Sequence, residues 1–400
     1  MSASGPGDLP PEAYATALAG LPQMGPARLT AVLDAARPAV AWARLREGAP
    51  WREPALDDVL GAKGPTLLST WRAATAAVDV RQVWRQVVQS GVGVVLRGHP
   101  GYPLVLADDI EPPSVLFHQG APDLLCCGLR VGVVGTRRCT HVGKGVAFEL
   151  GRDLAGAGVS VVSGLANGID AAAHRGALAT AGGLHSGAPP IGVVGSGLDV
   201  VYPSGQRQLW QLVAEAGILL SEAPLGARPE KWRFPARNRI IAALSDIVVV
   251  VESHARGGSL HTVDEADNRG IDVMVVPGSV RNDAAAGTNG LLVEGRAPAR
   301  HADDILSALG LTPASRRTHH DPRPAPSAAD RAVLDALGWQ PASLDQLVLR
   351  TSLPVPVLAG AVERLRAGGW VAQTGGWYQQ VAAGALSDPA DAPMAEAVAP

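Results

Sequence analysis

Cysteine is scarce in this sequence: only Cys126, Cys127 and Cys139 occur among 400 residues. They form no Cys-x-x-Cys pair, and no histidine cluster stands near them at metal-ligand spacing. We therefore expect no structural zinc site and no other bound metal.

Long apolar runs are also missing. The longest, Ile240 to Val251, is interrupted by Ser245 and Asp246 and falls short of the ~18 residues that a membrane span needs. The N-terminus has no basic region followed by an apolar one, so no secretory signal is visible. We expect a cytoplasmic protein with no membrane partner.

An overall excess of positive charge is lacking as well. The chain has 34 Lys and Arg against 37 Asp and Glu, a formal net charge of -3, so any nucleic-acid site must be a local patch. Apolar content is 47% and charged content 18%, as in ordinary globular proteins. At ~100–200 residues per domain, the length allows two to four domains.

Several catalytic and cofactor motifs are absent. There is no Gly-x-Ser-x-Gly elbow and no Walker A lysine loop. The segment Gly132-x-x-Gly135 lacks the full dinucleotide-binding pattern, and Ser163 stands where an acidic residue would close the second core strand. NAD binding is disfavoured, and we expect no cofactor and no catalytic residue.

One stretch, Lys231 to Arg239, stands out for its charge and aromatic content. From Arg228 to Arg239 five basic residues face one acid, and Trp232 and Phe234 add flat rings. Single-stranded nucleic acid needs such a pairing, because bases stack on rings while phosphates need cations. A packed core with a solvated basic rim explains the same residues, and on residue type alone the two interpretations are about even.

The middle of the chain alternates short Val-rich runs with helix-length segments. Continuous apolar runs without alternation are typical of strands that are covered by helices on both faces. The pattern predicts a Rossmann-like, doubly wound, mainly parallel sheet over residues 88–310. The predicted strands are 92–96, a second strand reached through 111–117, then 130–135, 159–163, 191–195, 217–220, 246–251 and 272–276.

Glycine and polar residues gather in the loops that follow these strands, where such sheets bind ligands. His174 stands four residues after Asp170, so the two could form a dyad with Ser163 as a nucleophile; capping by Asp170 and a loop bond from His174 is the stronger interpretation. The candidate loop residues are Gly135, Arg137, Arg138, Ser163, Gly164, Gly168, Asp170, His174, Gly257, Gly258 and Ser259.

Smaller segments flank the sheet. Residues 1–87 predict a helical domain whose Pro-x-x-Gly turn resembles a helix-hairpin-helix, although a protein-contact module is favoured. Residues 311–327 predict a linker, 328–381 a winged helix and 382–400 a disordered tail. The winged helix has no basic excess, which favours protein contact or regulation over duplex binding.

Taken together, the loop motifs resemble the DNA-processing protein A family, also called DprA or Smf. The resemblance covers about residues 102–295, and eight motifs occur in the right order. They are Val131-Gly-Val-Val-Gly-Thr-Arg137, Ser163-Gly-Leu-Ala-x-Gly-Ile-Asp-x-x-x-His174, Gly197-Leu-Asp-x-x-Tyr-Pro203, Ser221-Glu222, Phe234-Pro-x-Arg-Asn-Arg-Ile-Ile241, Gly257-Gly-Ser-Leu-x-Thr262, Val276-Pro-Gly278 and Gly287-Thr-Asn289.

The resemblance implies a homodimer that binds and protects single-stranded DNA and loads a RecA-type recombinase during natural transformation. It also implies roles for individual residues. Arg137 would contact phosphate, Lys231 with Arg237 or Arg239 would line a positive pocket, and Phe234 would stack on a base. The residues themselves add two expectations. Arg137 and Arg138, at the mouth of the first loop, are good phosphate ligands but could equally be rim charges, and Asn238, which leads straight into a predicted helix, could hold the loop in shape. Ser204 stands where many relatives carry a lysine, which implies a weaker or shifted phosphate contact.

A second hypothesis is enzymatic. The segment from Gly257 to Glu265 resembles the Gly-Gly-x-x-x-Thr-x-x-Glu pattern of nucleotide phosphoribohydrolases, in which a glutamate assists glycosidic cleavage. One short motif supports this hydrolase against eight for the DNA-binding family.

Overall fold

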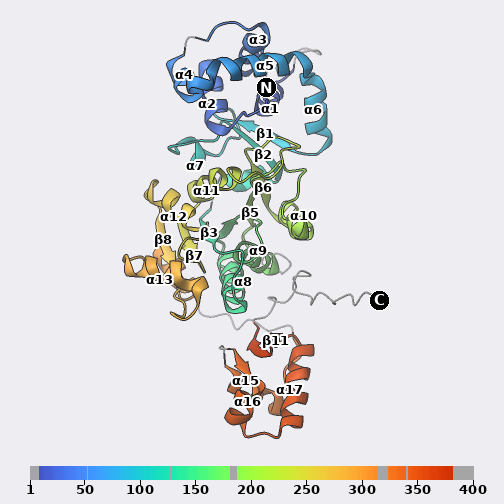
Figure 1. Cartoon of the computed structure of the whole chain (residues 1–400), viewed down its shortest axis with the longest axis vertical. Helices are drawn as coiled ribbons and strands as arrows, with labels where there is room; N and C mark the ends of the chain where they lie inside the picture. The colour runs from blue at the N-terminus through green and yellow to red at the C-terminus, as the bar shows by residue number, and fades with distance from the viewer. Residues whose placement is uncertain are drawn as a thin grey trace.

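A computed structural model describes residues 9–51, 53–126, 128–180, 187–312, 323–338 and 341–381 (Figure 1). The predicted tail, 382–400, and residues 313–322 of the predicted linker lie outside these described residues.

Short helices make up the N-terminal region, as predicted. Each of the first five α-helices has a proline in one of its first two positions. The fixed φ of proline suits a helix start, and its missing N–H removes no hydrogen bond there. Asp79 caps the sixth by accepting from Arg81 N at 2.8 Å. The elements are α1 (Pro11–Ala19), α2 (Pro26–Ala35), α3 (Pro38–Glu47), α4 (Pro54–Leu60), η1 (Gly61–Lys63), α5 (Gly64–Ala77) and α6 (Val80–Gln89).

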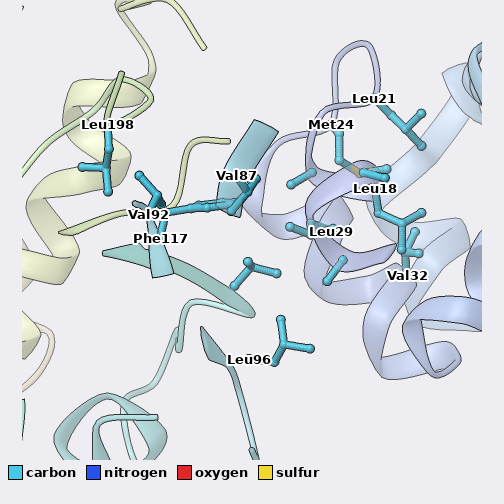
Figure 2. Packing of buried hydrophobic residues seen from close by; sticks show 14 of the residues in the cluster. Leu18, Leu21, Met24, Leu29, Val32, Val87, Val92, Leu96, Phe117 and Leu198 are labelled. Carbon is cyan, nitrogen blue, oxygen red and sulfur yellow. The ribbon is translucent and has the colours of Figure 1, made fainter. Parts of the chain in front are cut away.

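These helices share one hydrophobic core with the edge of the sheet. Figure 2 shows Leu18 and Leu29 on the helical side, with Leu96 and Phe117 from strands and Leu198 from a loop in the same cluster. All five are buried. The N-terminal region is therefore packed onto the sheet through apolar contact.

The central sheet has nine strands in the order β1-β2-β6-β5-β4-β3-β7-β8-β9. At one edge of the sheet, β1 pairs with β2 and β2 pairs with β6, both antiparallel. All the remaining pairs of this sheet are parallel. The bounds are β1 (Gly93–Leu96), β2 (Val115–Gly120), β3 (Arg130–Val134), β4 (Ser160–Ser163), β5 (Ile191–Val193), β6 (Ile218–Ser221), β7 (Ile247–Val250), β8 (Asp272–Val275) and β9 (Ala297–Pro298).

Helices cover both faces of this sheet. In β7, Ile247 and Val249 pack with α8, α9 and α14, whereas Val248 and Val250 pack with α11, α12 and α13. The remaining elements here are α7 (Leu104–Ala107), η2 (Pro122–Leu125), α8 (His141–Gly156), α9 (Ile169–Thr180), η3 (Ser204–Gln206), α10 (Arg207–Ala216), α11 (Arg233–Ala243), α12 (Leu260–Asp267), η4 (Asp283–Ala285), α13 (Ala286–Val293) and α14 (Ala302–Ala308).

The predicted doubly wound, mainly parallel sheet is confirmed. Its order reverses between β3 and β7: β4, β5 and β6 extend to one side of β3, while β7, β8 and β9 extend to the other. Loops that leave neighbouring strands toward opposite faces open a crevice at such a point.

The C-terminal module has the helices and strands of a winged helix, as predicted. Arg364 forms an ion pair with Asp330 at 2.6 Å, and Ser343 forms a capping box with Gln346. The elements are α15 (Ala328–Leu337), β10 (Ala342–Ser343), α16 (Leu344–Thr351), α17 (Val355–Ala367), β11 (Val371–Thr374) and β12 (Trp377–Gln380).

Candidate functional site

A cleft of about 560 Å³ opens where the strand order reverses. The loop after β3 contributes residues 135–138, and the loop after β7 contributes His254 and residues 256–259. One face of α11 forms a further wall. The cleft therefore lies at the carboxyl ends of the parallel strands, where this architecture binds ligands.

Helix α11 lines this cleft mainly with one of its faces, and Pro235 in its first turn adds to the lining. Phe234, Arg237, Asn238 and Ile241 all line the cleft, and their spacing of three, four and seven residues is that of one helix face. The basic stretch was expected to precede a helix, but α11 already begins at Arg233. Because the stretch is mostly helical, its basic residues point in different directions.

Positive charge dominates the lining. Four arginines, Arg137, Arg138, Arg237 and Arg256, line the cleft against one acid, Asp170. Within the described part of the chain, Arg137, Arg138 and Arg256 form no ion pair with a carboxylate, and all three are exposed. Guanidinium groups left free in a concave surface are suited to phosphate.

Phe234 supplies an aromatic surface beside these charges. The Arg137 guanidinium carbon lies 5.0 Å from the centre of the Phe234 ring. The rings of Tyr202 and Phe234 lie 5.6 Å apart at an interplanar angle of 41°. A side pocket of about 80 Å³ continues the cleft past Phe234 and is lined by Tyr202, Asn167 and Ser196, among others.

Arg237 is buried, and it holds the cleft in shape. Its guanidinium donates to the carbonyl of Val193, and its Nε donates to Asn238 Oδ1 at 3.2 Å. Burial lowers the pKa of Arg237, whereas Asp170 raises it. A Cβ at Gly164 would lie 2.3 Å from the Arg237 guanidinium and 2.5 Å from the Asp170 carboxylate, so a larger residue there would displace one of these two charged groups.

Burial raises the pKa of Asp170 to about 6, although Arg237, Arg137 and the backbone amides of Gly135 and Ala166 oppose the shift. The Asp170 carboxyl group, which lines a cationic cleft, is thus protonated at a higher pH than an ordinary aspartate. Its charge is sensitive to any anion that enters.

His174 lies behind the cleft and is fully buried. Burial lowers its pKa to about 4, and the carbonyl groups of Ser163 and Gly164 oppose this shift. Their geometry falls short of a hydrogen bond, and neither ring nitrogen has a hydrogen-bond partner among the described residues. The Ser163 hydroxyl donates to Val133 O at 2.5 Å. The alternative dyad of Asp170 and His174, with Ser163 as nucleophile, is therefore not assembled.

The loop residues divide into two groups. Gly135, Gly257, Gly258 and Ser259 line the cleft, together with Asp170 and Asn238. Ser163, Gly164, Gly168 and His174 lie behind it and are absent from its lining. Gly168 has φ +87°, and a Cβ there would lie 2.4 Å from Thr136 O. Both the backbone conformation and the lack of space therefore require glycine at this position.

Hydrogen bonds connect the two loops that form the cleft. Thr136 N donates to Glu252 O at 2.7 Å, and Thr136 Oγ1 lies 3.2 Å from His254 Nδ1. The buried Glu252 carboxylate accepts from Thr140 N at 2.8 Å and from Thr140 Oγ1 at 2.6 Å. The walls are therefore fixed to one another before any ligand arrives.

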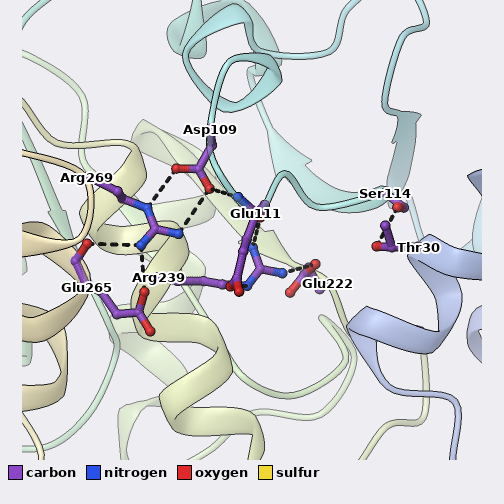
Figure 3. Close-up of polar contacts among 8 residues, drawn as sticks. All are labelled: Thr30, Asp109, Glu111, Ser114, Glu222, Arg239, Glu265 and Arg269. Atoms are coloured by element: carbon purple, nitrogen blue, oxygen red, sulfur yellow. Dashed lines mark hydrogen bonds and ion pairs between the residues drawn. The ribbon is translucent and has the colours of Figure 1, made fainter. Parts of the chain in front are cut away.

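Two predicted DNA-binding residues do not line the cleft. Lys231 is exposed and precedes α11. Arg239 is buried and forms an ion pair with Glu222 at 2.5 Å, and it also donates to Glu111 O at 2.6 Å (Figure 3). Arg239 lies two positions after Arg237 on α11, which turns their side chains to different faces of the helix.

The glutamate of the hydrolase motif is also engaged elsewhere. Glu265 accepts from Arg269 at 2.6 Å, and Arg269 forms a two-pronged pair with Asp109 at 2.7 and 3.1 Å (Figure 3). Glu265 does not line the cleft. The carboxylate of Glu265, which would assist glycosidic cleavage in a hydrolase, is instead held in a structural ion pair with Arg269.

Sequence reasoning missed three cleft residues with polar or charged side chains. Arg256, His254 and His261 come from the loop after β7 and the start of α12. Arg256 directly precedes Gly257 and Gly258, which were predicted to line the site. Its position beside them in the sequence could have identified Arg256 as a cleft residue. Among the residues that the structure describes, no group of three or more acidic, histidine or cysteine side chains could hold a metal ion. No described helix combines the length and apolar character needed to cross a membrane.

Two family models match the sequence. The model for DNA recombination-mediator protein A matches residues 93–310, and the model for the DprA winged helix domain matches residues 317–376. Both matches fall on the sheet and the winged helix described above.

Individual relatives agree with these models. DNA processing protein DprA of Bacillus subtilis is 38% identical over 221 residues, which cover 55% of this chain and 72% of the relative. The protein of the same name from Streptococcus pneumoniae is 39% identical over 206 residues, covering 52% and 70%. The X-ray structure of DNA processing protein A from Streptococcus pneumoniae aligns with a TM-score of 0.60 at 30% identity, covering 74% of this chain and 96% of that one.

Proposed function

Because the chain belongs to the DNA recombination-mediator protein A family, we propose that it binds single-stranded DNA in the cleft between β3 and β7 during DNA processing. The observation that carries this proposal is the joint presence of free arginines and an accessible aromatic ring. Arg137, Arg138 and Arg256 supply charge for phosphates, and Phe234 supplies a stacking surface for a base.

The geometry favours a single strand over a duplex. Phe234 can stack only on a base whose face is free, and bases inside a duplex are already stacked. The cleft encloses about 560 Å³, which suits a few nucleotides rather than a double helix. The chain's net charge of -3 also makes general attraction to duplex DNA weak, so that binding depends on the local patch.

The direct test is a titration against labelled single strands and matched duplexes at several salt concentrations. We expect single strands to bind more tightly, with an affinity that falls as salt rises, by about 0.7 in log–log slope for each phosphate contact. Equal affinity for duplex and single strand, or no salt dependence, would contradict the proposal.

We propose further that the cleft binds without catalysis. Glu265 is held by Arg269, and Ser163 donates to Val133 O, which leaves neither group in position for chemistry. Incubation with nucleoside monophosphates, followed by detection of free base, tests this directly. Released base would restore the hydrolase hypothesis.

The family resemblance supports three finer proposals: the protein forms a homodimer, acts in the cytoplasm, and delivers the bound strand to a RecA-type recombinase in natural transformation. Sedimentation of the pure protein tests the dimer. Strand-exchange assays with a recombinase and a competing single-strand binding protein test delivery, because a loader should relieve the inhibition.

A further inference from the structure

A second hollow, of about 600 Å³, lies on the other side of the first turn of α11. One wall is formed by residues 19–21, 23–25 and Arg28, around the turn between α1 and α2. The opposite wall is formed by residues 224–227, Glu230, Trp232 and Arg233. It lies outside the cleft described above, and the two share no lining residue. We call it the turn groove.

Trp232 is the aromatic side chain of the turn groove, and its ring is held in place. Its Nε1 donates to Glu230 Oε2 at 3.0 Å, and the Arg233 guanidinium carbon lies 4.4 Å from the ring centre. The far edge of the ring lies 4.0 Å from the position that a Cβ on Gly25 would take. Trp232 still remains 43% exposed. A fixed, exposed ring loses little conformational entropy when another flat group stacks on it.

The charge of the turn groove is weakly positive. Arg28 and Arg233 line it together with one acid, Glu230. Glu230 already accepts from Trp232 and lies 3.4 Å from Arg233 Nε, so its charge is largely balanced within the protein. Arg28, which donates to Gln23 O at 2.7 Å, is then a cation without an acidic partner among the described residues. This composition repeats that of the cleft: an aromatic ring beside guanidinium groups.

A series of hollows connects the turn groove to the cleft. A hollow of about 20 Å³ shares Trp232 and Arg233 with the turn groove. It also shares Gly195 and Arg237 with the side pocket, which in turn shares Arg137 and Phe234 with the cleft. This passage is too narrow for a nucleotide. A strand would instead cross over the exposed start of α11, where Lys231 lies.

We propose that the turn groove holds the next nucleotides of the strand that occupies the cleft, with a base stacked on Trp232 and Lys231 beside the crossing phosphates. This inference rests on the proposed function. It gives the N-terminal helical region a role as one wall of the DNA path, and it predicts that the two rings, Phe234 and Trp232, serve different parts of one strand.

Strand length separates the two sites. Single-strand binding modules cover about 4–16 nucleotides, so affinity should be compared for oligonucleotides of about 4 and about 12 nucleotides. Trp232→Ala should leave the short strand unaffected and weaken the long strand about 5- to 150-fold, the range for loss of one stacked base. Trp232→Phe should retain most of the long-strand affinity.

Two substitutions of opposite charge at Gly20, which we call the Gly20 pair, provide a test that leaves the Trp232 ring in place. Gly20 lines the turn groove with φ -81°, and a Cβ there would meet only Ala17 O at 3.6 Å and Thr16 O at 3.7 Å, so other residues fit. Gly20→Glu should weaken long-strand binding and Gly20→Lys should strengthen it, each by up to about fivefold. Neither should change short-strand binding.

The outcomes distinguish this inference from the proposed function. If short strands bind and both Trp232→Ala and the Gly20 pair leave long-strand affinity unchanged, the turn groove is not part of the DNA path, and a protein partner becomes its occupant. If no strand of either length binds to the wild type, both proposals fail. Loss of short-strand binding in Trp232→Ala, with both Gly20 variants like the wild type, would make Trp232 a support of the cleft and would overturn the inference.

Discussion

The arginines of the cleft and those of the neighbouring ion-pair network have the same side chain and opposite roles. Arg137 and Arg256 face solvent and form no ion pair with a carboxylate among the described residues. Arg239 and Arg269 are buried against Glu222 and Asp109, respectively. Counting basic residues therefore does not identify a DNA site, whereas asking which cations already have a partner does.

Helix α11 contains two buried arginines within one turn, and they serve different sites. Arg237 reaches the cleft, while Arg239 turns toward Glu222, which follows β6. Burial raises the pKa of Glu222, and the ion pair with Arg239 opposes that shift. The charges of the network are therefore balanced within the protein. The exposed arginines of the cleft are left for an anionic ligand.

The largest effect should come from breaking the network. Asp109 and Arg269 side chains are each only 4% exposed, so Asp109→Ala leaves a buried cation with one remaining partner, Glu265. We expect a loss of about 3 kcal/mol in the free energy of unfolding, measured with denaturant. Single-strand affinity should not change under conditions where the variant is folded.

Asp304→Ala is the matched control, because its partner Arg300 is solvent-exposed. Its unfolding free energy should lie close to that of the wild type. Equal losses in the two variants would show that burial does not distinguish the pairs.

Next in size is the aromatic contact of the cleft. Phe234→Ala should weaken single-strand binding by about 1–3 kcal/mol, because one base loses its stacking partner. Phe234→Tyr keeps a ring and should bind nearly as well. Fluorescence anisotropy with a labelled strand measures both, and an unchanged affinity for Phe234→Ala would assign the ring to packing with Tyr202.

Single charge removals should have smaller effects. Arg256→Gln and Arg137→Gln should each reduce the salt dependence of binding by about 0.7 in log–log slope, because each is expected to release one counterion. Arg300→Gln, on an exposed arginine outside the cleft, is the control and should keep the wild-type slope. A wild-type slope for Arg256→Gln would remove that residue from the interface.

The smallest effect concerns pH. Asp170 has a pKa raised from 3.8 to about 6, so between these values the folded protein holds a proton that the unfolded chain has lost. This contribution to stability is therefore lost as pH rises through that window. A bound polyanion should raise the pKa of Asp170 further. Affinity should therefore increase as pH falls from neutral toward about 6 and level off below that value, by at most about tenfold per pH unit for one proton.

Asp170→Asn should flatten this pH dependence. The variant keeps every other side chain that lines the cleft, His254 and His261 included. A pH profile identical to that of the wild type would show that Asp170 does not cause the pH dependence.

The sequence was sufficient for strands β1 to β8, though not for β9 or the strand order. Val-rich runs such as 130–134 and 247–250 are buried on both faces and are typical of parallel strands. The family resemblance implied that Phe234 and Arg137 both contact DNA, but their contact with each other was found only in the structure. The start of α11 at Arg233 was missed, since no side chain caps that helix and the stretch holds Pro235. Without that start, the helical spacing that separates Arg237 from Arg239 could not be applied.

Long-range partners were beyond sequence reasoning. Arg239 pairs with Glu222 across 17 residues, and Arg269 pairs with Asp109 across 160. These pairs depend on the strand order, because β2 and β6 must lie side by side to bring their loops near α11 and α12. Local spacing holds no information about that order.

Photo-crosslinking of a single strand, followed by identification of the attached peptides, tests the central claim most directly. We predict that a short strand attaches to residues 135–138, 234–241 and 254–262, the segments that line the cleft. Attachment confined to segments outside the cleft, such as the winged helix or the exposed Arg300 region, would contradict the assignment of the free arginines as the DNA site.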